Sequence, residues 1–230
     1  MLVEFGPDIW IADGAKVVAD FGFHYPTRMA IVRLADRKLF VWSPIDLTTD
    51  LRAQVDAIGT VTYLVAPNSL HHLFIGDWKR TYPEADAYAA PKLREKCGNI
   101  AFDNNLEDYS NAPWSSEIDH VVFRGNLITT EVVFFHIKSG TVIFTDLVQQ
   151  LPGEWLSGWR KIIARSDFLL GEEPMVPRKF RFAFIGRRVA RAALQRILTW
   201  PADRVLMAHG TPVTQNAQAF LRRAFRWLSP

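Results

Sequence analysis

This 230-residue chain contains a single cysteine, and it lacks long apolar runs. One cysteine, Cys97, excludes an intrachain disulfide and fits a reducing compartment. The first residues, MLVEFGPDIW, lack the basic flank and apolar core of a signal peptide. No stretch reaches the ~20 apolar residues that a membrane-spanning helix needs. We therefore expect a cytoplasmic protein without a transmembrane segment.

Several motifs that identify common activities are also missing. The chain has no glycine-rich phosphate loop, no Gly-x-Ser-x-Gly elbow and no zinc-finger spacing. It has no internal repeat and no low-complexity tract. These absences argue against P-loop nucleotide chemistry, a serine hydrolase built on an elbow and a zinc-finger module.

Charge is present but unevenly distributed. The net charge is +3, yet residues 1–150 contain 13 Lys/Arg and 19 Asp/Glu, whereas residues 151–230 contain 14 and 5. A basic C-terminal third could face an anionic substrate, a nucleic acid or a membrane surface. A solvated surface is the simpler interpretation, and nothing else in the sequence favours nucleic acid, so we expect no nucleic-acid partner.

Strand-like runs alternate with helical patterns along the chain. A hydrophobic content of 49% suits one large domain, or two small ones, with a real core, and we expect a single domain over residues 1–230. Asp13-Gly14 predicts a hairpin turn, and Asp46, Thr48 or Thr49 could cap a following helix. The order of elements predicts an α/β fold, a four-layer αββα sandwich with two sheets inside. The predicted strands are residues 2–5, 9–12, 29–34, 38–42, 61–65, 86–89, 118–123, 131–137, 141–145 and 204–208.

His71 and His72 stand where a predicted strand gives way to a predicted helix. Residues 61–65 are rich in β-branched and aromatic side chains, which predicts a buried strand. Pro67 and the turn-forming residues after it end that strand. Side chains at such a junction project beyond the edge of a sheet, where open α/β sheets bind ligands. The alternative is one capping histidine and one packed histidine.

Two more polar residues directly follow predicted strands, Asp146 and His209. If the strands are parallel, their ends meet at one edge of the sheet, so we expect His71, His72, Asp146 and His209 to converge. Two or three histidines and a carboxylate are a normal donor set for zinc or iron. Taken singly, Asp146 could cap a helix and His209 could belong to a turn.

The segments YLVAPNSLHHLF, TVIFTD and VLMAHGTPV carry a resemblance to a known family. Through them the chain resembles the metallo-β-lactamase fold superfamily, and more closely the branch called DUF4336. In the superfamily the first segment reads strand, then His-x-His-x-Asp-His, then helix. The second segment ends in an aspartate that bridges two metals, and the third carries a histidine before a glycine. The resemblance implies a metallo-β-lactamase-like sandwich and a hydrolase-like function.

The motif is incomplete when it is laid on this sequence residue by residue. Its first two histidines fall at Pro67 and Ser69, its aspartate at His71 and its last histidine at His72. The middle histidine of the superfamily falls near Asn126. We predict that Pro67, Ser69 and Asn126 bind no metal, because proline offers no side-chain donor and the other two are weak zinc ligands.

The resemblance therefore implies a single altered metal site rather than a pair of metals. Its ligands would be His71, His72, Asp146 and His209. Zinc is the expected ion, and iron or manganese is a less favoured alternative. Four protein ligands would close a tetrahedral site, so the donor set does not by itself provide a position for water.

Four other titratable residues have weaker signals. His24 lies in an aromatic segment, where it either packs or lines the pocket. Glu131 stands at the start of a strand and could support the ligands or act as an acid. We expect His136, which alternates within a strand, to be structural or exposed, and His120 to lie at the surface.

Three functions remain open from the sequence. The first is a metal-dependent hydrolase that acts on an ester, amide or phosphate, with a small molecule as substrate. The second is a non-catalytic descendant of the fold that has lost its metals and binds a ligand or partner in the cleft. The third is nucleic-acid processing, supported only by the basic C-terminal third. We favour the first; neither the substrate nor the oligomeric state follows from the sequence.

Overall fold

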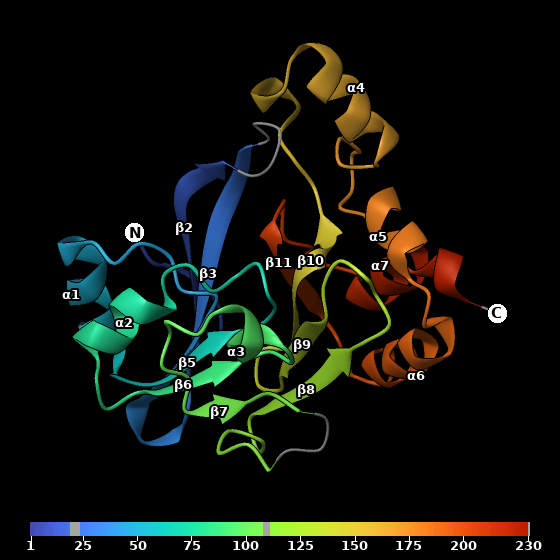
Figure 1. The fold of residues 1–230 in the computed structure, drawn as a ribbon. Helices are drawn as coiled ribbons and strands as arrows, with labels where there is room; N and C mark the ends of the chain where they lie inside the picture. Colours follow the sequence, from blue (N-terminus) through green and yellow to red (C-terminus); the bar gives the residue numbers. More distant parts are fainter. Residues whose placement is uncertain (19–23, 108–110, 230) are drawn as a thin grey trace.

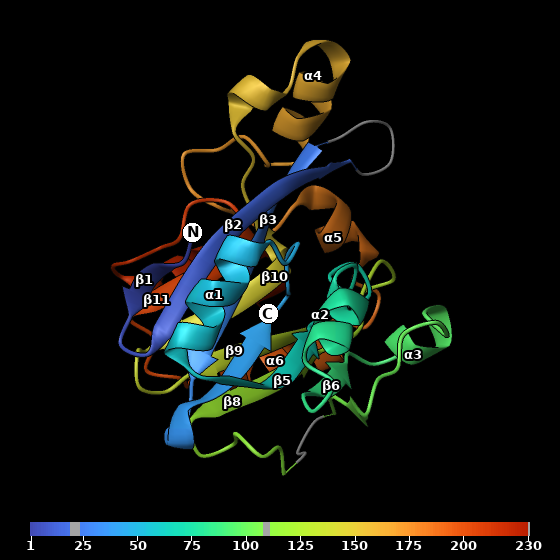
Figure 2. The same ribbon diagram turned by 90° about the vertical axis from the view of Figure 1, so that its left-hand side faces the viewer.

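Two mixed β-sheets stacked face to face form the centre of the molecule (Figure 1). The computed structural model describes residues 1–18, 24–107 and 111–229. Helices from the first half of the chain cover the outer face of one sheet, and helices from the second half cover the outer face of the other (Figures 1 and 2). The predicted four-layer αββα sandwich is therefore confirmed.

The first sheet changes from antiparallel to parallel along its width. β1 to β4 are antiparallel neighbours, and β4 to β7 are parallel. The predicted turn at Asp13-Gly14 is wrong, because β2 continues through it and pairs there with Arg28 and Thr27 of β3. The strands are β1 (Val3–Gly6), β2 (Ile9–Val18), β3 (His24–Arg33), β4 (Lys38–Trp42), β5 (Thr60–Ala66), β6 (Asp86–Ala89) and β7 (Asn104–Asn105).

Parallel strands need crossover connections, and three helices supply them. They are α1 (Thr49–Ile58), α2 (Ile75–Thr81) and α3 (Leu93–Lys96). Of the three candidate caps for α1, Thr48 is the one used, since its side chain accepts a hydrogen bond from Leu51 N at 3.2 Å. Leu51 of α1 and Trp78 of α2 belong to the apolar faces with which these helices pack on the sheet.

The second sheet has the order β11-β10-β9-β8. It consists of β8 (Ile118–Phe123), β9 (Glu131–His136), β10 (Thr141–Gln149) and β11 (Arg204–His209). β10 runs past the predicted end at residue 145, so Asp146 lies inside this strand. Pairing with the parallel strand β11 is regular up to Phe144 and resumes only at Gln149. Asp146 therefore lies in an irregular stretch of backbone, which frees its side chain for the site.

The later helices pack on the second sheet, with one exception. They are α4 (Gly158–Ser166), α5 (Arg178–Ala183), α6 (Arg187–Ile197) and α7 (Ala217–Ala224), and short 3₁₀ turns occupy Ala35–Arg37, Gly153–Trp155 and Arg226–Leu228. The C-terminal helical region thus consists of α7 followed by a 3₁₀ turn. α4 stands apart from the sandwich, beyond the far ends of β2 and β3 (Figures 1 and 2). Among the described residues, no helix has both the length and the apolar character needed to cross a bilayer.

Aromatic side chains fill the space between the two sheets. Phe40 of the first sheet meets Phe134 of the second at a ring-centroid distance of 5.4 Å, and Trp114 packs on Phe40 at 4.9 Å. Both contacts are edge-on, the arrangement that aromatic quadrupoles favour. Burial of this apolar surface is the main force that holds the two sheets together. It therefore also fixes the position of the edge of one sheet relative to the edge of the other.

His136 is a buried residue of β9, one of the two alternatives expected for it. It is 1% exposed, and its Nδ1 lies 2.8 Å from Ser139 Oγ, which donates in turn to Thr141 Oγ1. The imidazole is therefore the donor to Ser139. Burial lowers the pKa of His136 from 6.5 to about 4, with Lys138 acting in the same direction and Asp8 opposing.

We predict an acid-sensitive stability that depends on His136. Between the two pKa values the unfolded chain binds a proton that the folded protein does not, so stability is lost as the pH falls from 6.5 towards 4. Protonation of His136 in the unfolded chain should lower the free energy of unfolding by about 2 kcal/mol between about pH 7 and about pH 5. Urea unfolding of the wild type and His136→Asn measures it, since the asparagine amide can still donate to Ser139. An equal loss in both proteins would contradict the prediction.

Candidate metal centre

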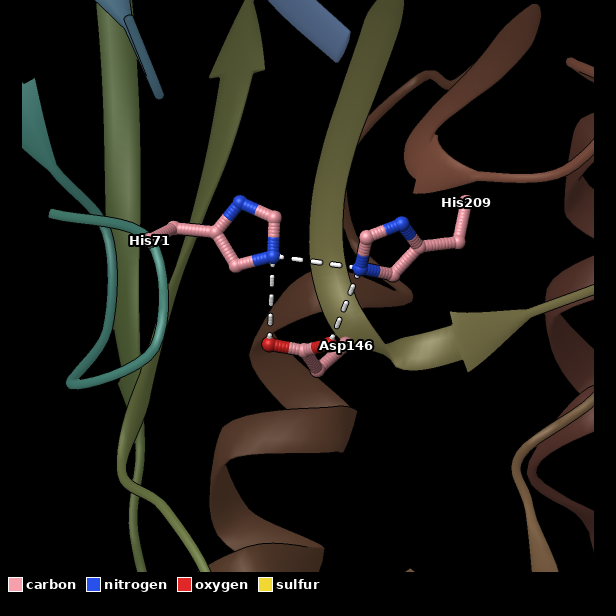
Figure 3. Close-up of side chains that lie close together, drawn as sticks. All are labelled: His71, Asp146 and His209. Carbon is pink, nitrogen blue, oxygen red and sulfur yellow. Dashed lines mark hydrogen bonds and ion pairs between the residues drawn. The ribbon is translucent and has the colours of Figure 1, made fainter. Parts of the chain in front are cut away.

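Three side chains converge at one edge of the sheets, His71, Asp146 and His209 (Figure 3). The Nε2 atoms of the two imidazoles are 3.2 Å apart. His71 Nε2 lies 3.5 Å from Asp146 Oδ2, and His209 Nε2 lies 3.3 Å from Asp146 Oδ1. The carboxylate thus offers one oxygen to each ring, and the predicted convergence of these three residues is observed.

The three side chains come from two neighbouring strands of one sheet and from a loop that follows a strand of the other. His71 lies in the loop between β5 and α2, Asp146 in the irregular part of β10, and His209 at the end of β11. His71 and His209 are 138 residues apart in sequence. Because β10 and β11 are parallel, their C-terminal ends lie at the same edge, and the packing of the sheets brings the β5 loop over it.

Two amides hold the Asp146 carboxylate in place. Asn68 Nδ2 donates to Oδ2 at 2.7 Å, and Gln149 Nε2 donates to Oδ1 at 2.9 Å. Asn68 is fully buried, and Gln149 is 1% exposed. Burial alone would raise the pKa of Asp146, but the two histidines beside it hold that pKa well below its usual range. The carboxylate is therefore ionised and acts only as an acceptor.

His209 presents its Nε2 lone pair to the site. Its Nδ1 is 2.6 Å from the carbonyl oxygen of Pro26, which can only accept, so the ring proton sits on Nδ1. Burial lowers the pKa of His209 and so favours the neutral ring. Arg28 braces this loop by donating to the carbonyls of Met207 at 3.0 Å and Gly210 at 2.6 Å. Gly210 has a φ of 131°, a conformation that glycine adopts without strain.

His71 is oriented by both its ring and its backbone. Its Nδ1 lies 2.8 Å from Ser43 Oγ, a group that can donate or accept. Asn68 Oδ1 accepts from the backbone N–H groups of Leu70 at 2.8 Å and His71 at 3.0 Å. Asn68 therefore uses its two ends to fix two of the three converging residues.

The donor set fits a metal ion. When Ser43 accepts from His71, both Nε2 atoms are bare and face each other beside a carboxylate, and a cation between them removes the repulsion. Their separation of 3.2 Å matches the ~3.3 Å between two ligands of a tetrahedral ion with bonds of about 2.0–2.1 Å. Two imidazoles and a carboxylate are also ordinary zinc ligands. When Ser43 donates instead, a single proton on His71 Nε2 satisfies the cluster.

Glu131 supports the strand that carries Asp146. This carboxylate is fully buried and accepts from three consecutive backbone N–H groups, those of Thr145 at 2.7 Å, Asp146 at 2.7 Å and Leu147 at 3.0 Å. Regular pairing of β10 ends at Ile143 towards β9 and at Phe144 towards β11, so these groups lie beyond both ladders. Burial, reinforced by the charge of Asp146, raises the pKa of Glu131 to about 7. Of its two predicted roles, the structure supports that of a neighbour that positions the ligands.

His72 lies apart from the three converging donors. It lines the same pocket, but its ring nitrogens are not among the donor atoms that lie within 4.8 Å of one another. Its Nδ1 is buried and meets no hydrogen-bond partner within the described part of the chain. Burial, with Lys96 as a second cause, lowers the pKa of His72. Its assignment as a fourth metal ligand stays a prediction.

The positions where the superfamily motif is missing make structural contacts. The Asn126 amide donates to Phe180 O at 2.8 Å, and its oxygen accepts from Ile128 N at 2.9 Å. Ser69 Oγ lies 3.3 Å from Thr129 Oγ1, and Pro67 O accepts from Val132 N at 2.8 Å. These groups tie loops together and converge on no common point.

The converging donors lie in a pocket of about 580 Å³. Apolar side chains dominate its lining, with Ile45, Leu169 and Phe180 in its walls. Lys179, whose Nζ is 3.2 Å from the Tyr25 hydroxyl, is a polar exception. A largely apolar cavity with a few convergent polar groups is the usual form of a small-molecule site.

The structure corrects one further expectation and adds residues that the sequence did not indicate. His120 is buried rather than at the surface, with Nε2 2.8 Å from Glu107 O. His24 is exposed at the start of β3 and is not among the residues that line the pocket. Asn68 and Gln149 were not identified as functional, although the run PNS could have suggested a side chain that caps the turn before His71.

Comparisons with known proteins agree with this description. Residues 7–158 match the family described as a domain of unknown function, DUF4336. A search of the curated proteins gives no match. His209 and α4 beyond Gly158 lie outside the matched residues, which do include His71 and Asp146.

Solved structures with the metallo-β-lactamase fold match the whole chain. The DIM-1 metallo-β-lactamase exposed to ceftazidime is 14% identical, with a TM-score of 0.66 over 100% of this chain and 97% of that one. The FIM-1 enzyme from Pseudomonas aeruginosa in its mono-zinc form is 11% identical, with a TM-score of 0.61 over 100% and 96%. The Flv1 flavodiiron core from Synechocystis sp. PCC6803 is 11% identical, with a TM-score of 0.65 over 99% and 60%. At these identities the structural similarity shows the fold alone. It confirms the metallo-β-lactamase-like fold that was expected from the sequence.

We predict that Glu131→Gln destabilises the protein by about 2–4 kcal/mol, because an amide N–H₂ then faces backbone N–H groups in a buried place. Glu117→Gln is the matched control, since Glu117 accepts a single backbone bond, from Ala35 N at 3.0 Å, in an exposed position. That change should cost less than about 1 kcal/mol. Denaturant unfolding at mildly alkaline pH measures both. Equal effects of the two changes would show that Glu131 has no special part in holding β10.

Proposed function

The chain belongs to the DUF4336 family, and from this premise we propose that it is a metal-dependent hydrolase with one metal ion held by His71, Asp146 and His209. The observation that carries the proposal is the convergence of these three donors, 3.2–3.5 Å apart, in an apolar pocket. We also propose that residues 1–230 act as one domain, because a single core lies between the two sheets.

Zinc is the ion we propose, ahead of iron or manganese, because imidazole nitrogens make up most of the donor set. The mono-zinc form of FIM-1 supports one-ion occupancy in this fold. Three protein ligands leave a position open, which distinguishes a catalytic site from a closed structural one. When bound, such an ion would polarise a carbonyl or phosphoryl oxygen and make a water molecule more acidic.

The chain's own residues prepare the site. Pro26 O and Ser43 Oγ orient the two rings so that both Nε2 atoms face the pocket. Asn68 and Gln149 keep both oxygens of Asp146 directed at the rings. Partners of this kind fix ligand orientation, and their loss usually weakens metal binding by about 10–100-fold.

His72 is the residue we propose for proton transfer. It lines the same pocket as the three donors, and its Nδ1 has no hydrogen-bond partner in the described residues. An imidazole that lines the pocket can accept a proton from water or donate one to a leaving group. The apolar walls around it exclude bulk water, which strengthens each polar contact inside. The substrate would be an ester, amide or phosphate ester of a small molecule.

One observation favours a second candidate function, a ligand-binding protein without metal. Ser43 Oγ can donate to His71 Nδ1, and the proton then on His71 Nε2 would join the two rings and Asp146 without any ion. The pocket would keep its shape in that state and could bind an apolar ligand.

Metal content per chain tests the ligands. We predict about one zinc per wild-type chain and little zinc in His209→Ala, with affinity reduced by more than about 100-fold, because the loss of a ligand exceeds the effect of losing a supporting contact. His72→Ala should retain zinc. His24→Ala, a change of an exposed histidine, is the matched control. Zinc that is indifferent to His209 would refute the assignment, and zinc lost from His72→Ala would restore the four-ligand site.

Hydrolysis of p-nitrophenyl carboxylic and phosphate esters tests the reaction. We predict that a chelator abolishes turnover by the wild type and that added zinc restores it. His72→Ala should lower kcat by about 10²–10⁴-fold while its zinc content stays unchanged, the range expected for loss of a proton-transfer group. Stoichiometric zinc without turnover of any ester would support a binding protein, and so would an absence of zinc.

A further inference from the structure

The mouth of the pocket is surrounded by exposed apolar side chains. Leu70 and Leu73 from the β5–α2 loop, Ile128 from the β8–β9 connection and Ile163 from α4 all line the pocket, and each is between 43% and 61% exposed. Three separate segments thus place branched aliphatic side chains in water at one opening. Scattered exposed apolar residues are normal on a protein, but a cluster at one site indicates an interaction surface.

α4 extends this apolar surface outward. Trp159, Ile162 and Ile163 occupy positions i, i+3 and i+4, which places them on one face of the helix. Ile162 is 72% exposed, and the buried residue of the helix is Ala164, two positions on and therefore on the opposite side. The apolar face of this helix is thus largely exposed, with Ile163 also lining the pocket. α4 itself projects from the sandwich (Figures 1 and 2).

A second exposed apolar group adjoins Ile128. Backbone bonds join Leu127 N to Ala183 O at 3.0 Å and Ile185 N to Gly125 O at 3.1 Å, so these two segments lie side by side. Leu127, Ile185 and Phe182 are all at least 70% exposed. Residues 182–185 therefore add exposed apolar side chains close in sequence or by backbone bonds to Phe180 and Ile128, which line the pocket.

Basic side chains accompany the apolar ones. Residues 151–191 contain nine Lys/Arg and four Asp/Glu. On α4 the exposed Lys161 and Arg165 lie one turn apart, with Arg165 beside the apolar face and Lys161 further round the helix. Arg187 and Arg188 at the start of α6 are exposed just after Ile185. This combination of aromatic and aliphatic side chains with lysine and arginine is typical of helices that lie in a membrane interface.

We propose that this face, defined as Leu70, Leu73, Leu127, Ile128, α4 and residues 182–188, docks on an anionic lipid surface. Exposed isoleucine, leucine and tryptophan would enter the boundary of the acyl chains, while the basic groups bind lipid phosphates. A second copy of this chain would place basic residues against basic residues. Nucleic acid would use the basic groups but would leave the aliphatic ones in water.

The pocket opens within the docking face, because Leu70, Leu73, Ile128 and Ile163 belong to both. An apolar or amphipathic molecule could then pass from the lipid surface into the apolar pocket without crossing bulk water. The docking itself requires neither a metal nor the pocket histidines, so it stands or falls independently of the proposed hydrolysis.

Flotation of the full chain with vesicles tests the proposal. The vesicles consist of phosphatidylcholine alone, or of phosphatidylcholine in which phosphatidylglycerol replaces part of the lipid. We expect the wild type to bind the anionic vesicles, and added salt to weaken that binding because it screens the basic groups. Ile162→Gln with Ile163→Gln should weaken binding by at least about 10-fold. Lys161→Gln with Arg165→Gln should weaken binding by about 5–30-fold, and only on anionic vesicles.

Ile137→Gln is the matched control for the apolar change. Ile137 is 49% exposed in the turn between β9 and β10, at the opposite end of β10 from the pocket, so its replacement should leave vesicle binding unchanged. Circular dichroism confirms folding of each variant. A wild type that does not float with anionic vesicles would overturn the proposal. So would a control that loses as much binding as the α4 variants, a dimer in ultracentrifugation that the Ile162/Ile163 change abolishes, or an affinity for DNA that exceeds that for vesicles.

Discussion

The buried charge of Asp146 is the constraint on which the rest of the site depends. A carboxylate in the interior must be compensated by hydrogen bonds and by positive or polar partners, because desolvation of an ion is costly. Here Asn68 and Gln149 supply the hydrogen bonds, and His71 and His209 face the two oxygens. The partners come from the β5–α2 loop, from β10 itself and from the end of β11, so the compensation of one charge also determines where three segments meet.

A second buried carboxylate, that of Glu131, satisfies the backbone N–H groups around Asp146. Where the regular pairing of β10 with β9 and β11 stops, backbone N–H groups must find other acceptors. Glu131 takes three of them from the neighbouring strand β9. The irregularity that frees the Asp146 side chain is therefore stabilised by a residue that does not line the pocket. The charge of Asp146, after burial, raises the pKa of Glu131.

The altered motif changes what the fold can do in this chain. Where the superfamily places further histidines, Pro67 and Asn126 bind backbone groups and hold the loops around the pocket. One donor cluster of this kind is found among the described residues, in a cavity whose other walls are largely apolar. The apolar lining continues outward through Ile163 onto the exposed face of α4. The pocket and the surface around it thus share one chemical character, which suits a ligand that is itself largely apolar.

Local patterns in the sequence were enough to predict most strands and to show which polar residues stand at their ends. The alternation and β-branching of residues 118–123 and 204–208 predict strands that the structure contains, and a polar residue after a strand marks the sheet edge. Only the tertiary structure decided that His71, rather than its neighbour His72, meets Asp146, because the direction of a loop side chain depends on long-range hydrogen bonds such as those of Asn68. Periodicity carries no information about such bonds. The same holds for the exposed face of α4, since an amphipathic pattern shows that a helix has an apolar side but not what that side will meet.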